Sequence, residues 1–138
     1  MNLIAEHQLR NTQADAVQLE PWIQSFAEAA NLSANARQAF DLALVEWVTN
    51  IISYGFPDGG DHLIRLRFLA DRHSASVEVS DDGVAFDPLA VPAVDTQAPL
   101  DGRPIGGLGI HLIRRLMEQV EYSRTDGRNV LKLRRSIL

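Results

Sequence analysis

The chain has 138 residues, which suits one domain with a modest core, and its 46% hydrophobic and 22% charged residues are ordinary for a globular protein. It contains no cysteine, which excludes disulfides, thiolate zinc clusters and cysteine nucleophiles. No apolar run of about 18 residues and no signal-like start is present, so we expect a cytoplasmic protein that is not bound to a membrane. The net charge of −5 also argues against direct nucleic-acid binding, although residues 107–138 are locally basic.

The first half of the chain predicts one strand and two helices. Alternation over 3–9 indicates a short strand, and apolar residues at helical spacing over 13–30 indicate a helix that ends at Asn31. Ser33 is a suitable N-cap for a second, mostly buried helix that ends near Tyr54 and Gly55. A glycine-containing loop at 57–60 follows.

The second half predicts four strands, a long loop and a third helix. Strand-like runs at 62–69 and 74–80 form an expected antiparallel pair, and the proline-rich segment 81–104 forms a loop of the kind that usually has a function. A helix to about Glu118 precedes a hairpin of strands 120–124 and 129–133 around Asp126 and Gly127. This order predicts a single α/β (α+β) domain, a two-layer sandwich with helices on one face of a mixed, largely antiparallel sheet.

The second helix presents an unusual polar stripe. Glu46, Thr49, Asn50 and Ser53 fall within an arc of roughly 100°. Plain amphipathicity explains such a stripe, but a solvated face normally carries several lysines, arginines and acids, whereas this one has small neutral groups and one carboxylate. Glu46 could orient or deprotonate a hydroxyl group or water, and Asn50 could offer its carbonyl oxygen to a hard cation. Spacing alone leaves both interpretations open.

Two further segments could contribute to a binding site. Asp81 and Gly83 lie at a strand end, where an Asp-Asp-Gly sequence is usually only a turn. The glycines between residues 105 and 110 open directly into the third helix, where backbone N–H groups and the positive helix end could hold a phosphate. A glycine-rich junction can also be a simple turn, so its meaning depends on the other two segments.

The three segments in this order resemble the ATP-binding boxes of the GHKL superfamily, which has the Bergerat ATP-binding fold and includes sensor histidine kinases. The matching motifs are Glu46-x-x-x-Asn50, Asp81-x-Gly83-x-Ala85-Phe86-Asp87, and Gly106-Gly107-Leu108-Gly109. The likeness extends over nearly the whole chain and is closest to the stand-alone bacterial anti-sigma factor serine/threonine kinases. Ala85 replaces a second glycine, Tyr54 replaces a frequent histidine, and no phosphoacceptor histidine helix precedes the domain.

The resemblance implies a role for each matching residue. Asn50 would ligate a Mg²⁺ ion that bridges the ATP phosphates, and Glu46 would activate the attacking hydroxyl group. Asp81 would accept a hydrogen bond from the adenine amino group, because an ionised carboxylate is an acceptor only. Residues 88–105 would form a lid over ATP. The implied cofactor-binding residues are Asn50, Asp81, Gly83, Ala85, Phe86, Arg103, Gly106, Gly107, Leu108, Gly109 and Ile110.

The resemblance further implies an ATP-dependent serine/threonine protein kinase that acts as an anti-sigma factor. Its expected substrate is an anti-anti-sigma protein of the STAS type, and it would sequester a sigma factor and could form a homodimer. The alternative is a module that binds ATP or ADP, switches protein partners and transfers nothing. Glu46 favours the kinase over the module, because a pure binder needs no carboxylate beside the metal ligand, but an ATPase would need this carboxylate equally.

Overall fold

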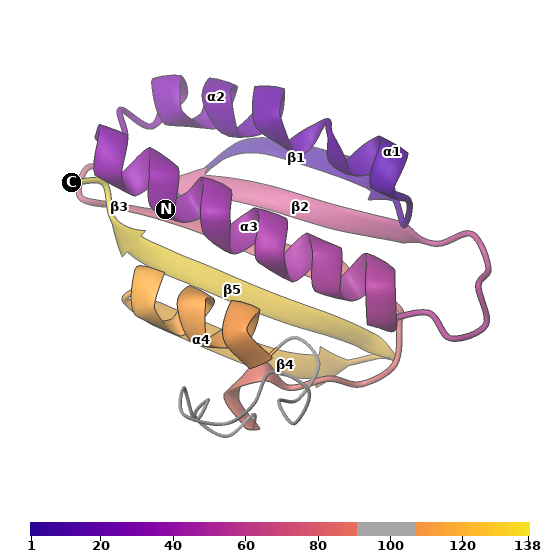
Figure 1. Cartoon of the computed structure of the whole chain (residues 1–138). Helices are drawn as coiled ribbons and strands as arrows, with labels where there is room; N and C mark the ends of the chain where they lie inside the picture. The colour runs from indigo at the N-terminus through magenta and orange to yellow at the C-terminus, as the bar shows by residue number, and fades with distance from the viewer. Residues whose placement is uncertain (91–106) are drawn as a thin grey trace.

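The computed structural model describes residues 1–90 and 107–138, with side chains in the second range described from residue 109 onward (Figure 1). In chain order the elements are β1 (Asn2–Arg10), α1 (Gln13–Ala16), α2 (Leu19–Ala29), α3 (Ala34–Tyr54), β2 (Leu63–Ala70), β3 (Ser74–Asp81), the 3-10 turn η1 (Pro88–Ala90), α4 (Gly107–Leu116), β4 (Gln119–Thr125) and β5 (Arg128–Ser136). None of these described helices is both long enough and apolar enough to span a membrane.

The strands form one sheet in the order β1-β2-β3-β5-β4, and every neighbouring pair is antiparallel. Helices α2, α3 and α4 lie side by side across one face of this sheet (Figure 1). The predicted two-layer arrangement is therefore confirmed. Within the described residues every neighbouring pair of strands is antiparallel, so the sheet contains none of the parallel pairs that the expected mixed sheet would have.

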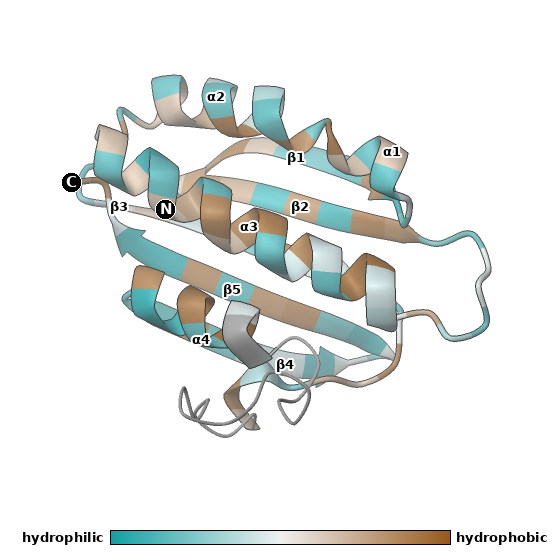
Figure 2. Cartoon of the chain, viewed as in Figure 1, coloured by the Kyte–Doolittle hydropathy of each residue, from teal (hydrophilic) through white to brown (hydrophobic). Residues whose placement is uncertain are grey.

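The core lies between the helices and the sheet. Apolar and polar residues alternate along β2 (Figure 2), and its inward side chains Ile64, Leu66 and Phe68 are fully buried. Helix α3 contributes the buried Phe40 and Leu44 from the opposite side. The other sheet face is mainly polar, with charged side chains such as Arg67, Glu78 and Lys132, as expected for an antiparallel sheet with one wet face.

The predicted helix over 13–30 is wrong in one respect, because it is two helices. Thr12 caps α1 by accepting a hydrogen bond from the N–H of Asp15 at 3.1 Å. The break falls before α2, whose third residue is Pro21. A continuous helix would place the proline ring against the carbonyl group of Val17 and lose a backbone hydrogen bond there, so the chain starts a new helix instead.

Three predicted helix and turn signals are confirmed. Asn31 ends α2 with a left-handed φ of 57°. Ser33 caps α3 by accepting the Ala36 N–H at 3.0 Å. Asp126 and Gly127 both have positive φ, 54° and 74°, which is the backbone of the type I′ turn that suits a two-residue hairpin between β4 and β5.

Candidate functional site

One cavity of about 250 Å³ lies where α3, the end of β3, the segment after it and β5 meet. Its wall is mostly apolar with a few polar groups, the usual composition of a small-molecule site. The lining residues are Trp47, Asn50, Ile51, Tyr54, Gly55, Asp81, Val84, Phe86 and Asn129. The cavity thus joins the predicted polar helix to the predicted strand-end carboxylate.

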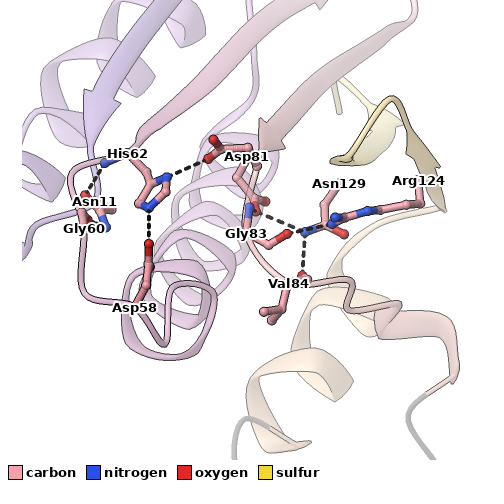
Figure 3. Close-up of polar contacts among 10 residues, drawn as sticks. Asn11, Asp58, Gly60, His62, Asp81, Gly83, Val84, Arg124 and Asn129 are labelled. Carbon is pink, nitrogen blue, oxygen red and sulfur yellow. Dashed lines mark hydrogen bonds and ion pairs between the residues drawn. The ribbon is translucent and has the colours of Figure 1, made fainter.

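Asp81 is the buried carboxylate of this cavity and is 2% exposed. Its Oδ1 accepts hydrogen bonds from the Gly83 N–H at 2.9 Å and from Nδ2 of Asn129 at 3.1 Å (Figure 3). Burial raises the pKa of Asp81, and these two hydrogen bonds together with the charge of Arg128 oppose the rise. Both of these hydrogen bonds use Oδ1, which leaves Oδ2 as the acceptor that could face an amino group of a ligand.

The amide of Asn50 is oriented by its own helix. Its Nδ2 donates to the backbone carbonyl of Glu46 at 2.9 Å. The side-chain oxygen is the other end of this amide, and an amide oxygen is a suitable ligand for Mg²⁺. Asn50 and Glu46 therefore fit a site for a metal-bound phosphate on the same helix that lines the cavity.

Gly109 brings the start of α4 against these two residues. A Cβ atom at this position would lie 2.5 Å from Oε2 of Glu46 and 3.5 Å from Nδ2 of Asn50. The N-terminal turn of α4, with its partial positive charge, is therefore adjacent to Glu46 and Asn50. Ile110 is 2% exposed, so its side chain belongs to the core and only its backbone is suited to a phosphate contact.

Gly83 is required by a backbone contact. A Cβ atom there would lie 2.5 Å from the carbonyl oxygen of Gly55, and the same oxygen accepts the Val84 N–H at 2.9 Å. The turn after β3 is thereby joined directly to the end of α3. This close approach of two backbones supplies a reason for glycine in addition to the expected approach of a base.

Phe86 lines the cavity, whereas Ala85 is exposed and is not among the lining residues. The ring of Phe86 stacks over that of Trp47, with a centroid distance of 6.0 Å and an interplanar angle of 28°. Phe86 therefore forms an apolar wall of the cavity. A role for Ala85 at the ligand stays a prediction.

Several predicted site residues lie outside the described residues. Arg103 and Gly106 fall in 91–106, as does most of the expected lid over 88–105. Gly107 and Leu108 are described only as the first two residues of α4. The predicted roles of these four residues remain predictions.

Asn129 is a cavity residue that none of the three motifs predicts. This residue is 4% exposed and its side chain lies beside Asp81 at the cavity wall. A signal was present, because Asn129 shares its side of β5 with the buried Leu131 and Leu133. A polar side chain at an inward position of a strand indicates a buried hydrogen-bonding role.

The fold and this cavity define a two-layer domain with a buried carboxylate at one cavity, beside the junction of a polar helix face and the first turn of α4. The family model of the histidine kinase-like ATPase domain matches residues 9–135. The chain belongs to the histidine kinase-like ATPase family. This membership implies ATP as the ligand and confirms the resemblance inferred from the three motifs.

Two curated relatives are protein kinases. The serine/threonine-protein kinase BtrW of Bordetella bronchiseptica is 32% identical over 112 residues, covering 81% of this chain and 79% of the relative. The serine-protein kinase RsbW of Listeria monocytogenes is 28% identical over 113 residues, covering 79% and 72% respectively. The expected class of relative, a serine/threonine kinase, is confirmed.

Two solved structures share the fold. The RsbU and RsbW domains of Rv1364c from Mycobacterium tuberculosis match with a TM-score of 0.65 and 14% identity, over 96% of this chain and 32% of that chain. The SiaB–SiaC complex from Pseudomonas aeruginosa matches with a TM-score of 0.58 and 16% identity, over 97% of this chain and 90% of that chain. At these identities the likeness shows the fold alone.

Proposed function

We propose that the protein is an ATP-dependent serine/threonine protein kinase. The observation that carries the proposal is the arrangement around one cavity: Asp81 at its buried end, with Asn50 and Glu46 next to the first turn of α4. Two kinases of the same family, at 32% and 28% identity, support it.

Glu46 is suited to be the catalytic base. It would take the proton from the hydroxyl group of the partner's serine or threonine, while that oxygen bonds to the γ-phosphorus and the bond to the ADP oxygen breaks. Bound Mg²⁺, for which the Asn50 side-chain oxygen is a suitable ligand, would supply positive charge that offsets the phosphate charge. The remaining contribution of the protein is the positioning of ATP and of the attacking hydroxyl group.

The proposed protein substrate is a STAS-type anti-anti-sigma protein, and the proposed second partner is a sigma factor that the kinase sequesters in the cytoplasm. These partners, and a homodimeric state, rest on the resemblance to anti-sigma factor kinases. The kinase reaction itself rests on Glu46 and its neighbours.

The test is incubation of the purified protein with Mg²⁺ and labelled ATP together with STAS proteins from the same genome. Label should appear on a serine or threonine of one of them. Glu46→Gln should lower this transfer by about 10²- to 10⁴-fold while ATP still binds. Asp41→Asn is the matched control, because it removes a carboxylate from an earlier turn of the same helix and should leave transfer unchanged.

The outcomes separate the kinase from the partner-switching module. Label that disappears in Glu46→Gln and persists in Asp41→Asn supports the kinase. ATP binding without label on any partner contradicts it and supports a module that only binds nucleotide.

A further inference from the structure

Asn129 is a buried residue whose side chain connects three separate parts of the chain. Its Nδ2 donates to Oδ1 of Asp81 at 3.1 Å and to the carbonyl oxygen of Val84 at 2.8 Å (Figure 3). Its Oδ1 accepts the Phe86 N–H at 3.4 Å and the hydroxyl group of Tyr122 on β4. Both ends of the amide are therefore used.

These contacts determine which way the amide faces. A backbone N–H can only donate, and a backbone carbonyl can only accept. The Phe86 N–H therefore requires the amide oxygen on its side, and the Val84 carbonyl requires the amide nitrogen on the other. Tyr122 adds a second donor to the oxygen. As a result, Asn129 presents an N–H donor to Asp81.

The amide orientation in turn determines what Asp81 presents to a ligand. Its Oδ1 faces two donors, Nδ2 of Asn129 and the Gly83 N–H, so it must act there as an acceptor. Any proton on the carboxyl group would therefore sit on Oδ2, the oxygen left for the ligand. An ionised Oδ2 accepts a hydrogen bond from an amino group, whereas a protonated one donates to a carbonyl oxygen.

Adenine and guanine differ at this kind of contact. Adenine offers an exocyclic amino donor at the position where guanine offers a carbonyl acceptor. We propose that Asn129 is a positioning residue that keeps Asp81 an acceptor toward the base, so that the site selects ATP over GTP, and that Tyr122 orients the Asn129 amide. This inference rests on the proposed use of ATP at this cavity.

Other groups around Asp81 also affect its pKa, and the variants described below leave these groups unchanged. Burial raises the pKa of Asp81, Arg128 on β5 lowers it, and the neighbouring Asp82 raises it. Tyr54 of α3 lines the same cavity. Loss of the Asn129 hydrogen bond adds to the effect of burial, so less Asp81 is ionised at a given pH.

The test is calorimetric titration of the full chain with Mg-ATP and with Mg-GTP between pH 5 and pH 8, for the wild type and three variants. Asn129→Leu replaces the amide by an apolar side chain of similar size and so removes both N–H donors of Nδ2. Tyr122→Phe removes only the hydroxyl group that orients the amide. Arg124→Gln is the matched control, since Nη1 of Arg124 supports the same turn by donating to the Gly83 carbonyl at 2.7 Å without a bond to Asp81.

The wild type should prefer ATP, with an affinity that falls toward acid pH. In Asn129→Leu the midpoint of that fall should move to higher pH, and the preference for ATP over GTP at neutral pH should shrink on the order of ten-fold. Tyr122→Phe should change both quantities in the same direction by less. Arg124→Gln should weaken both nucleotides together and leave the midpoint in place.

The results of this titration distinguish a failure of the inference about Asn129 from a failure of the proposed ATP binding. If Asn129→Leu loses the same factor for both nucleotides at every pH, its role is merely structural and the inference is overturned. If that variant does not fold, Tyr122→Phe decides: a raised midpoint supports the inference, and wild-type behaviour overturns it. A wild type that binds neither nucleotide overturns the proposed function and this inference together.

Discussion

At the residue scale, the proposed binding of ATP depends on the buried carboxylate of Asp81. Its ionised form is disfavoured by burial, so the folded protein binds a proton there more tightly than the unfolded chain does. The protein retains this costly group at the cavity wall, although an amide of the same shape could accept the same two hydrogen bonds. We attribute its presence to the ligand.

Asp81→Asn should separate ligand binding from stability. The free energy of unfolding of the wild type should rise as pH falls through the raised pKa of Asp81 toward 3.8, the ordinary pKa of an aspartate, because protonation removes the cost of a buried charge. Asp81→Asn should lack this component and be at least as stable as the wild type at pH 7. Urea denaturation at several pH values measures this; a less stable variant at pH 7 would contradict the account.

At the element scale, two glycines each allow a close contact, but the partners differ in what they can tolerate. Gly83 faces the backbone carbonyl of Gly55, which cannot move without moving α3. Gly109 faces the end of the Glu46 side chain, which can rotate away. An added methyl group should therefore lower the stability of the fold at position 83, and at position 109 it should mainly displace the Glu46 side chain.

Gly83→Ala should destabilise the fold by about 1–3 kcal/mol, because the methyl group forces the turn after β3 away from α3. Gly60→Ala is a matched control, since the nearest atoms to its Cβ are the movable side-chain ends of Asp58 and His62 at 3.2 and 3.3 Å. Chemical denaturation of both variants measures the difference. Equal losses in the two variants would argue against a rigid contact at Gly83.

Gly109→Ala should leave stability nearly unchanged or slightly raised, because alanine favours a helix over glycine by about 1 kcal/mol. The methyl group should instead displace the carboxylate of Glu46 and lower phosphate transfer. The comparison needs both the unfolding free energy and the transfer rate of the same preparation. A variant that loses stability but transfers phosphate normally would contradict the proposed position of Glu46.

His62 connects the loop after α3 to the turn after β3. Its ring nitrogens contact Asp58 at 3.2 Å (Figure 3) and Asp82 at 3.1 Å. The ring also stacks on that of Phe56. Partial burial opposes the charge on His62, but the hydrogen bonds and attraction from the two carboxylates outweigh it and raise the pKa above 6.5. The protonated ring therefore stabilises the folded state.

This stabilisation should be complete below pH 6.5 and be lost as pH rises through the raised pKa of His62. Between pH 6 and pH 8.5 the wild type should thus lose more unfolding free energy than His62→Gln does. Thermal or urea unfolding at both pH values provides the comparison. If the two proteins lose the same amount, His62 does not act as a charged link.

At the scale of the whole molecule, the sequence predicted local features such as helix caps and turns, but it did not predict which distant residues contact one another. Asn31, Ser33 and the Asp126-Gly127 turn were readable because each acts through its own neighbours. The pairing of Asp81 with Asn129 across β3 and β5 was not, since it joins residues 48 positions apart and depends on β5 lying between β3 and β4. Strand order is a property of the assembled sheet.

In the candidate site, too, some residues were predicted from the motifs and others become apparent only in the folded structure. The motifs predicted Glu46, Asn50 and Asp81, and the described residues bring Asn50 and Asp81 to one cavity with Glu46 one helical turn from Asn50. The second motif predicted Phe86, but the partner of its ring in the apolar wall, Trp47, was not predicted, because Trp47 alone is an ordinary core aromatic. Tertiary packing alone makes them face one cavity.

The most direct test of the account is the change in melting temperature that Mg-ATP produces in the wild type and in Asp81→Asn. At a nucleotide concentration of 100 times Kd, binding should stabilise the wild type by about 2.7 kcal/mol. For a domain of this length that corresponds to roughly 9 °C. Asp81→Asn should fold and show little or no shift at the same concentration. No shift in the wild type, or an equal shift in the variant, would contradict an ATP site built on Asp81.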